Sequence, residues 1–367
     1  MRYWRSIRRR WYKYKPPQIC WDVKTWARES GSELHTFQEF APMVRQVPHT
    51  VAPEISPEYT SRLNGLGVSK YLAVLKNAKF AGKRGLMILP DGQYAAESVF
   101  TPEQVTQDPY YLVPPARAVY KRGNYFSLIN AWAFGYYHWL HDSLLKLFQV
   151  HAVLPKDIQY IVPSDLKPWH LDILSVFGIS PGQLVPFDHQ QVWRLENLYF
   201  TNRTNHAGWN HPSCDFWVRN LFYDFFKIEE STPRLRLYIS RNGMRKRFVL
   251  NEAEVMDLLA PLGFEIVKPE TLSIGDQVKL FSQAEIVIAA HGSALTNLYF
   301  TSLGARVVDM IEPHMNSFRY VFWSLCESLG QQYWYLDAES VENSSGRADM
   351  RVDIEKLAAT VARIGVA

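Results

Sequence analysis

The sequence has 367 residues, a net formal charge of +4, 47% hydrophobic residues and 21% charged residues. A chain of this length exceeds the usual size of one domain, and its apolar content excludes an intrinsically disordered protein. The three cysteines are far apart in the sequence and form no C-x-x-C pair, which argues against a disulfide framework and a zinc site. There is neither an apolar signal-peptide core nor a run of about 18 apolar residues, so we expect a cytoplasmic protein without a membrane span.

Residues 1–15 contain seven basic side chains and no acidic one. Because this number exceeds the net charge of the chain, the remainder is slightly acidic, which argues against a nucleic-acid partner. Basic groups interleaved with tyrosine and tryptophan suit the headgroup region of an anionic membrane, although a solvated basic segment is the alternative. We therefore predict that residues 1–60 form a basic and aromatic N-terminal extension whose first 15 residues contact a membrane surface, peripherally and on its inner face.

Residues 61–230 are predicted to form an N-terminal α/β domain. Its expected strands lie at residues 86–89, 125–129, 159–162 and 197–200, and its expected helices at about 135–150 and 171–177. The polar stretch 226–233 ends in Ser-Thr-Pro and is the predicted linker to the next domain.

Residues 231–345 show the clearest alternation of strands and helices. Strands are expected at residues 235–240, 264–267, 285–290 and 306–311. Helices are expected to begin at Asn251, with Glu254 completing a capping box, and at Ser273. This order predicts a doubly wound parallel sheet, closed by an amphipathic C-terminal helix within residues 346–367.

Ligands of such sheets bind beyond the carboxyl ends of the strands. The strand at 235–240 is followed by a loop that contains Arg241, Arg245 and Arg247. Guanidinium groups bind phosphate oxygens through paired donors, so this loop predicts a diphosphate ligand, and a solvated basic loop is the alternative.

The strand at 285–290 is followed by the sequence His-Gly-Ser-Ala-Leu-Thr-Asn. A glycine at this position lets backbone approach a ligand, and the amides of a helix start favour an anion. We therefore assign ligand-binding roles to His291, Gly292, Ser293, Thr296 and Asn297. Asp309, near the end of the next strand, is expected either to accept hydrogen bonds from ribose hydroxyls or to be a buried aspartate that caps a helix.

His138 and Asp142 lie one turn apart on the expected helix 135–150, on a polar face flanked by aromatic residues. This pair predicts a general base with a partner at a sugar-binding surface, and a capping pair on a solvated face is the alternative. The sequence contains no D-x-D, P-loop, G-x-G-x-x-G or H-E-x-x-H motif, so we expect neither a metal nor a bound cofactor.

Taken together, these motifs resemble glycosyltransferase family 61 over about residues 120–313. The resemblance rests on Tyr238-Ile239-Ser240-Arg241, Asn251-Glu252, Gly263-Phe264, Gln277, Ala284, residues 291–297, Phe300, Val307-Val308-Asp309, and His138-Trp139-Leu140 with Asp142. It implies a GT-B fold, with two Rossmann-like doubly wound domains facing across a cleft, the second of which binds a nucleotide sugar.

The resemblance further implies an inverting, metal-independent glycosyltransferase that moves xylose, arabinose or N-acetylglucosamine from a UDP-sugar to a glycan or glycolipid hydroxyl. Asp142 would be the base and His138 its partner, and the donor would be a substrate rather than a cofactor. We expect a role in polysaccharide biosynthesis, such as capsule or lipopolysaccharide assembly. The alternative is a catalytically inactive nucleotide-sugar or carbohydrate-binding subunit, suggested by aspartate at position 309 where the family usually has glutamate.

Overall fold

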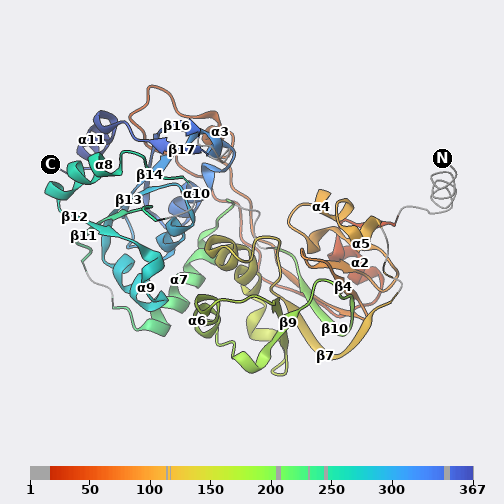
Figure 1. The fold of residues 1–367 in the computed structure, drawn as a ribbon. Coiled ribbons are helices and arrows are strands. Elements are labelled where there is room, and N and C mark those ends of the chain that lie inside the picture. Colours follow the sequence, from red (N-terminus) through yellow and green to blue (C-terminus); the bar gives the residue numbers. More distant parts are fainter. Residues whose placement is uncertain are drawn as a thin grey trace, which may run out of the picture.

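The computed structural model describes residues 17–366 except 113–114, 116, 204–207, 230–231, 244–246 and 343–347. The expected membrane-contact segment 1–15 therefore lies outside the described residues, and so does Arg245. The described chain is built around two large β-sheets, with α6 (Pro168–Val176) and α7 (Pro212–Phe226) in the region between them (Figure 1).

The C-terminal half contains a five-stranded sheet in which every pairing is parallel. Its strands are β11 (Leu235–Ile239), β12 (Phe264–Val267), β13 (Ala284–Ala290), β14 (Arg306–Ile311) and β15 (Gln332–Asp337). Their spatial order is β12-β11-β13-β14-β15. This is the doubly wound order that reverses direction between the first and third strands, so the predicted parallel sheet is confirmed and its switch point lies between β11 and β13.

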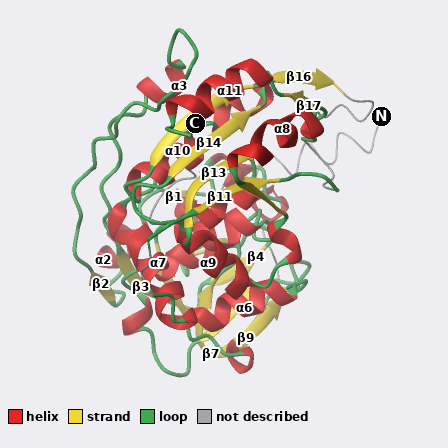
Figure 2. Cartoon of the chain, turned by 90° about the vertical axis from the view of Figure 1, so that its left-hand side faces the viewer, coloured by secondary structure: helices red, strands yellow, loops and turns green. Residues whose placement is uncertain are grey.

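Helices cover both faces of this sheet because alternate strand residues point to opposite sides (Figure 2). On one face, Tyr238 and Ile288 pack with α8 (Glu252–Leu259) and α11 (Ile354–Arg363). On the other face, the neighbouring strand residues pack with α9 (Ile274–Ser282), α10 (Tyr320–Ser328) and α7. The expected C-terminal helix is confirmed by α11.

The two predicted helix caps differ in outcome. Ser273 caps α9, since its hydroxyl accepts a 3.1 Å hydrogen bond from the backbone N–H of Asp276. Asn251 precedes α8, but its side chain makes no cap hydrogen bond to that helix. Its amide instead donates to Val352 O at 2.8 Å and accepts from Val352 N at 2.9 Å. The predicted capping box is therefore wrong, because the amide of Asn251 holds the segment before α11.

The N-terminal half contains a ten-stranded mixed sheet. Its strands are β1 (Ile19–Cys20), β2 (Leu34–Thr36), β3 (Tyr71–Lys76), β4 (Lys79–Ala81), β5 (Leu86–Ile88), β6 (Tyr94–Ala95), β7 (Val119–Ser127), β8 (Gln159–Pro163), β9 (Leu184–Phe187) and β10 (Trp193–Thr201). The neighbours β10, β7, β8 and β9 run parallel, whereas β3 and β4 pair antiparallel with β10.

The four strands expected in this half are confirmed as β5, β7, β8 and β10, but the sheet that they join is mixed and differs from the doubly wound sheet that the resemblance implies. The reason lies in the short connections: β4 and β5 are joined by a turn with Gly82 and Gly85 at φ values of +70° and +74°. Such a turn makes an antiparallel hairpin, whereas parallel neighbours need a long crossover.

The described part of the predicted N-terminal extension belongs to both halves. β1 pairs with β6, and β2 pairs with β3. Further along, His49 exchanges backbone hydrogen bonds with β15, donating to Tyr333 O at 2.9 Å and accepting from Tyr335 N at 3.0 Å. Residues 17–60 are thus integrated into the fold.

One apolar cluster joins the two halves, since it contains Leu140 and Leu144 from the first and Leu295 and Leu298 from the second. The boundary between them follows α7, which ends at Lys227 with a left-handed backbone. The GT-B arrangement of two separate domains stays a prediction.

Shorter elements complete the described chain. The remaining helices are α2 (Val23–Glu29), α3 (Pro57–Thr60), α4 (Glu103–Thr106) and α5 (Pro109–Leu112), and a hairpin is formed by β16 (Glu339–Glu342) and β17 (Ala348–Arg351). Single turns or short 3-10 segments are η1 (Ala96–Ser98), η3 (Leu144–Leu147), η4 (His151–Val153), η5 (Pro181–Gln183), η6 (Ala260–Leu262), η7 (Pro269–Thr271), η8 (Ser293–Phe300) and η9 (Pro313–Phe318). The segment η2 (His138–Ser143) is π-helical.

Candidate functional site

A pocket with an empty volume of about 800 Å³ opens at the switch point of the parallel sheet. We call it the switch-point pocket. Its walls come from the end of β11, the end of β13, the loop before α9, and two aromatic residues of the N-terminal half, Tyr136 and Trp169. The sequence predicted a ligand site at these strand ends, and of its assigned residues Arg241, Ser293 and Asn297 line the pocket.

Arg241 follows β11 and is largely buried, with 8% of its surface exposed. Its backbone N–H donates to the carboxylate of Glu252 at 3.0 Å, and its Nε donates to Arg247 O at 3.0 Å. Burial, together with the nearby charge of Arg247, lowers the pKa of Arg241 to about 10. The alternative of a solvated basic loop is therefore wrong for Arg241.

Gly292 lies directly against this arginine. A Cβ atom at position 292 would overlap Arg241 Nη1. The backbone of Gly292 has a φ of 175°, which any residue adopts, so the missing side chain matters only through the space that it leaves for Arg241. The sequence predicted that Gly292 lets backbone approach a ligand; in the structure it lets the guanidinium group occupy the strand end.

Arg247 connects the two strand-end loops. Its Nη1 donates to His291 O at 2.7 Å, and burial lowers its pKa. Guanidinium groups from Arg241 and Arg247 are thereby fixed between the ends of β11 and β13. Two partly desolvated guanidinium groups at the end of a parallel sheet are suited to bind an anion.

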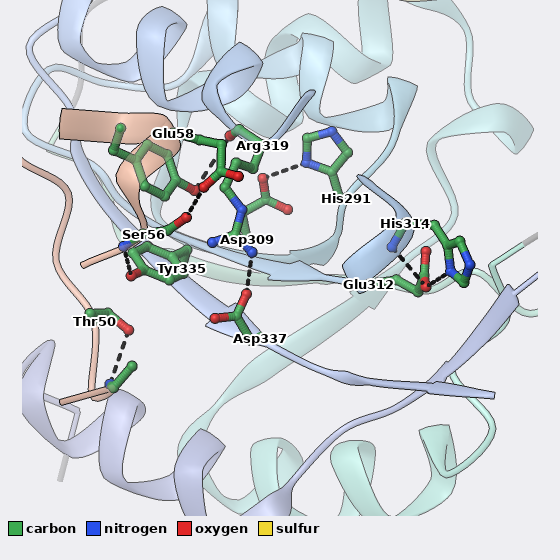
Figure 3. A network of polar contacts seen from close by, with 12 residues as sticks. Thr50, Ser56, Glu58, His291, Asp309, Glu312, His314, Arg319, Tyr335 and Asp337 are labelled. Carbon is green, nitrogen blue, oxygen red and sulfur yellow. Dashed lines mark hydrogen bonds and ion pairs between the residues drawn. The ribbon is translucent and has the colours of Figure 1, made fainter. Parts of the chain in front are cut away.

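His291 and Asp309 form a buried pair, with Nδ1 of the imidazole 2.7 Å from Oδ2 of the carboxylate (Figure 3). Tyr333 donates to the same oxygen at 2.8 Å. Asp309 is fully buried, as the alternative expected, but its hydrogen bonds go to His291 and Tyr333 and not to the start of a helix; its contact with a ribose stays a prediction. Its carboxylate orients His291, which leaves Nε2 as the ring nitrogen that can meet a ligand.

Asn297 links the pocket to the N-terminal half. Its side-chain oxygen accepts from the hydroxyl of Tyr136 at 2.9 Å, and its amide donates to Gln277 at 2.9 Å. Asn297 is fully buried, so it positions the pocket wall through these contacts. Thr296 is also fully buried and does not line the pocket.

His138 and Asp142 are hydrogen-bonded through Nδ1 and Oδ2 at 2.6 Å. The two side chains differ in exposure, at 32% for His138 and 1% for Asp142. Burial raises the pKa of Asp142, but the hydrogen bond from His138 and the charges of His141 and Arg203 outweigh it, so the pKa lies below its usual value. The carboxylate is thus ionised and shielded, whereas the imidazole reaches the surface.

The helix predicted at 135–150 is present as irregular helical turns over His138–Leu147, but the predicted polar face is wrong, because His141 and Asp142 are buried. The π-helical turn η2 is followed by the 3-10 turn η3, and both flanks of the segment are buried. His141 lies inside the protein, where its Nδ1 donates to Tyr299 Oη at 3.1 Å and Tyr299 donates to Asp215 at 2.9 Å. Burial lowers the pKa of His141 to about 4 and raises that of Asp215 to about 6.

Several site residues were missed by the sequence reasoning. Tyr136, Trp169 and Glu270 line the switch-point pocket, and Tyr299 and Asp215 support His141. Trp169 and Glu270 lie outside the strand-end pattern, and no local pattern marks them, whereas Tyr136 is one of the aromatic residues that flank His138 in the sequence. The buried pair His291–Asp309 did have a signal, because Asp309 of β14 is paired with Ala289 of the parallel neighbour β13, and His291 follows Ala289 by two residues.

Within the described ranges, no group of three or more His, Cys, Asp or Glu side chains is close enough to hold a metal ion. Over the same ranges, no helix combines the length and apolar character needed to cross a bilayer. Cys20, Cys214 and Cys326 are buried free thiols, in agreement with the predicted absence of a disulfide framework.

Doubly wound parallel sheets bind their ligands at the switch point, where this chain has a pocket with Arg241 at its wall. Residues 136–308 match the family model described as Glycosyltransferase 61. The resemblance stated from the sequence is confirmed.

Curated relatives are similar to this chain over part of their length. The beta-1,2-xylosyltransferase XYXT1 of Oryza sativa subsp. japonica is 24% identical over 213 residues, which cover 53% of this chain and 44% of the relative. The alpha-1,3-arabinosyltransferase XAT3 of the same plant is 24% identical over 197 residues, or 48% of this chain and 34% of the relative. The protein O-linked-mannose beta-1,4-N-acetylglucosaminyltransferase 2 of Canis lupus familiaris is 23% identical over 221 residues, or 50% and 36%. The chain thus matches less than half the length of each.

Proposed function

We propose that this chain is an inverting glycosyltransferase that moves a sugar of the xylose, arabinose or N-acetylglucosamine type from a UDP-sugar to a glycan or glycolipid hydroxyl. The observation that carries the proposal is the switch-point pocket, with Arg241 at its wall. The three named relatives are themselves transferases of xylosyl, arabinosyl and N-acetylglucosaminyl groups. The matching part of the chain contains both the pocket and the His138–Asp142 pair.

The pocket offers the donor both an apolar surface and a positive charge. Leu272, Ile274 and Trp169 provide apolar surface for a flat base, and Arg241 provides charge at the strand end. When the bond between the anomeric carbon and the diphosphate oxygen breaks, negative charge grows on the leaving group. Arg241, supported by Arg247, stabilises this charge, and its fixed position avoids a reorganisation cost during the reaction.

The acceptor hydroxyl is activated by His138. The acceptor oxygen attacks the anomeric carbon from the face opposite the diphosphate, and its proton passes to His138 Nε2. Asp142 holds the ring through Nδ1 and stabilises the imidazolium that forms. This reverses the roles expected from the sequence, because Asp142 is too buried to touch an acceptor while His138 is exposed.

We further propose that the transfer needs no metal ion, since two guanidinium groups already supply positive charge beside the diphosphate position.

The proposed setting is the synthesis of a capsule or lipopolysaccharide glycan by a GT-B enzyme at the cytoplasmic membrane face. Residues 1–15 would bind the anionic surface. Deletion of these residues should weaken binding to phosphatidylserine vesicles and leave UDP binding unchanged; equal vesicle binding by both proteins would refute this part.

The test of the function is release of UDP from UDP-xylose, UDP-arabinose and UDP-N-acetylglucosamine, with and without glycan acceptors. We expect release from at least one donor, and a rise in melting temperature with UDP that is lost on Arg241→Met. UDP binding without release from any donor would favour the alternative of an inactive binding subunit. No UDP binding by the intact protein would overturn both.

A further inference from the structure

A second hollow lies in the N-terminal half, outside the switch-point pocket. Its empty volume is about 690 Å³, and its lining includes Trp21, Glu97, Phe100, Pro102, Asn202 and Arg203. We call it the Arg203 hollow. A smaller cavity of about 370 Å³ continues from it, because Glu97 and Arg203 line both.

A row of side chains connects this hollow with His138. The rings of His138 and Trp132 lie 5.4 Å apart, and those of Trp132 and Phe100 lie 4.5 Å apart in an edge-to-face contact. The guanidinium group of Arg203 lies 4.5 Å from the ring of Phe100. The ring of Trp132 therefore separates the hollow from the partly exposed imidazole of His138.

Arg203 has an unused donor. Its Nη1 is shielded from solvent and has no hydrogen-bond partner among the residues that the structure describes. Burial lowers the pKa of Arg203, although the charge of Asp142 acts in the opposite direction. A shielded guanidinium group without a paired carboxylate gains most from an oxyanion that accepts from two of its N–H groups.

Glu97 is the acidic group of the hollow, and it is already engaged. Its Oε2 accepts hydrogen bonds from Val23 N at 2.7 Å and from the hydroxyl of Tyr71 at 2.9 Å. Within the described chain it forms no ion pair with Arg203. Trp21, with 64% of its surface exposed, adds an aromatic wall of the kind on which sugar rings pack.

We propose that the Arg203 hollow binds an acidic sugar unit of the acceptor, with the carboxylate or phosphate of that sugar on Arg203 and its ring against Trp21. The assignment to the acceptor rests on the proposed function, because it depends on His138 being the site of acceptor activation. The binding of an acidic sugar at the hollow does not depend on it. The enzyme would thereby select a glycan that carries negative charge near the hydroxyl to be modified.

The test compares methyl β-glucuronide, glucose 6-phosphate and methyl β-glucoside as probes, with binding followed by ligand-observed NMR. We expect at least one charged probe to bind about ten-fold more tightly than the neutral glucoside, and the better of the two identifies the carboxylate or the phosphate as the ligand group. Equal binding of charged and neutral probes would overturn the proposal.

Variants of Arg203 and Trp21 test whether the preference for charged probes arises in the Arg203 hollow. Arg203→Met should abolish the preference for charge, and Trp21→Ala should weaken all probes alike. Arg203→Lys keeps the positive charge and is the variant chosen to preserve the fold. Because an ammonium group cannot offer paired planar donors, this variant should lose most of the preference for charged probes. The matched control is Arg194→Met on β10, where the arginine is exposed. A preference that survives both Arg203 variants would also overturn the proposal.

UDP-induced thermal shifts separate this inference from the proposed function. All Arg203 variants should keep the shift of the intact protein, because the switch-point pocket is unchanged. An intact protein that prefers charged sugars but neither binds UDP nor cleaves UDP-sugars would refute the glycosyltransferase function and leave the hollow's ligand class standing.

Discussion

Nδ1 of His138 lies 2.6 Å from a carboxylate oxygen of Asp142, and the two residues face different environments. Asp142 is enclosed, whereas about a third of the His138 side chain is open to solvent. In the proposed function, Nε2 of His138 therefore accepts the proton, and Asp142 fixes the ring.

His138→Ala should lower kcat for sugar transfer by roughly 10²–10⁴, because no side chain is left to accept the proton of the acceptor hydroxyl. Asp142→Asn should cause a smaller loss, since the ring remains but is no longer held by a charge. Neither change should alter the UDP-induced thermal shift, because neither residue lines the switch-point pocket. His35→Ala, at an exposed histidine, serves as the control. A dead Asp142→Asn enzyme beside an active His138→Ala enzyme would restore the roles expected from the sequence.

Gly292→Ala should weaken UDP binding at least ten-fold, since the added methyl group would displace Arg241 from the strand end. The matched control is Gly182→Ala, where a Cβ meets no atom within 4 Å. Calorimetric titration with UDP measures both, and melting temperatures verify that both proteins fold. Unchanged affinity in Gly292→Ala would show that the position of Arg241 is irrelevant to the donor.

The sequence predicted those parts of the fold that depend on hydrophobic periodicity and on the position of strand ends. The strands of the parallel sheet could be located because doubly buried strands are continuous apolar runs, and the loops after β11 and β13 were found because parallel strands end at one edge. The mixed sheet was not predictable in the same way, since its pairings depend on contacts distant in sequence.

The site could be predicted only as a set of residues, and their roles required the structure. His138 and Asp142 are four residues apart in an α-helix or in a π-turn, so the same spacing fits an exposed pair and a half-buried one. Likewise, Asp309 is a strand-end carboxylate in the sequence, and its burial against His291 and Tyr333 depends on packing of β13, β14 and β15.

Arg241→Gln should raise KM for the UDP-sugar and lower kcat, because charge on the leaving diphosphate grows in the transition state. The same assay should retain its rate in excess EDTA, since the charge is supplied by Arg241 and Arg247. Manganese added after chelation should have no further effect. Loss of turnover in EDTA with recovery on manganese addition would contradict metal independence.

The free energy of unfolding should depend on His141 in a defined pH window. Burial lowers the pKa of this imidazole to about 4, whereas an unfolded histidine titrates near 6.5. Between these values the unfolded chain binds a proton that the folded chain excludes, so the contribution of His141 rises with pH and is complete above about 6.5. Asp215 acts oppositely: burial raises its pKa to about 6, so its contribution falls as pH rises from about 4 to 6.

Because the two effects overlap, a variant is needed to separate them. The difference in unfolding free energy between the intact protein and His141→Gln should grow by about 2 kcal/mol from pH 5 to pH 7. Urea unfolding followed by tryptophan fluorescence at several pH values measures this difference. His35→Gln, at an exposed position, should show a constant difference over the same range. A constant difference for His141→Gln as well would mean that this histidine titrates normally in the folded state, and that the chain from His141 through Tyr299 to Asp215 is open to protons.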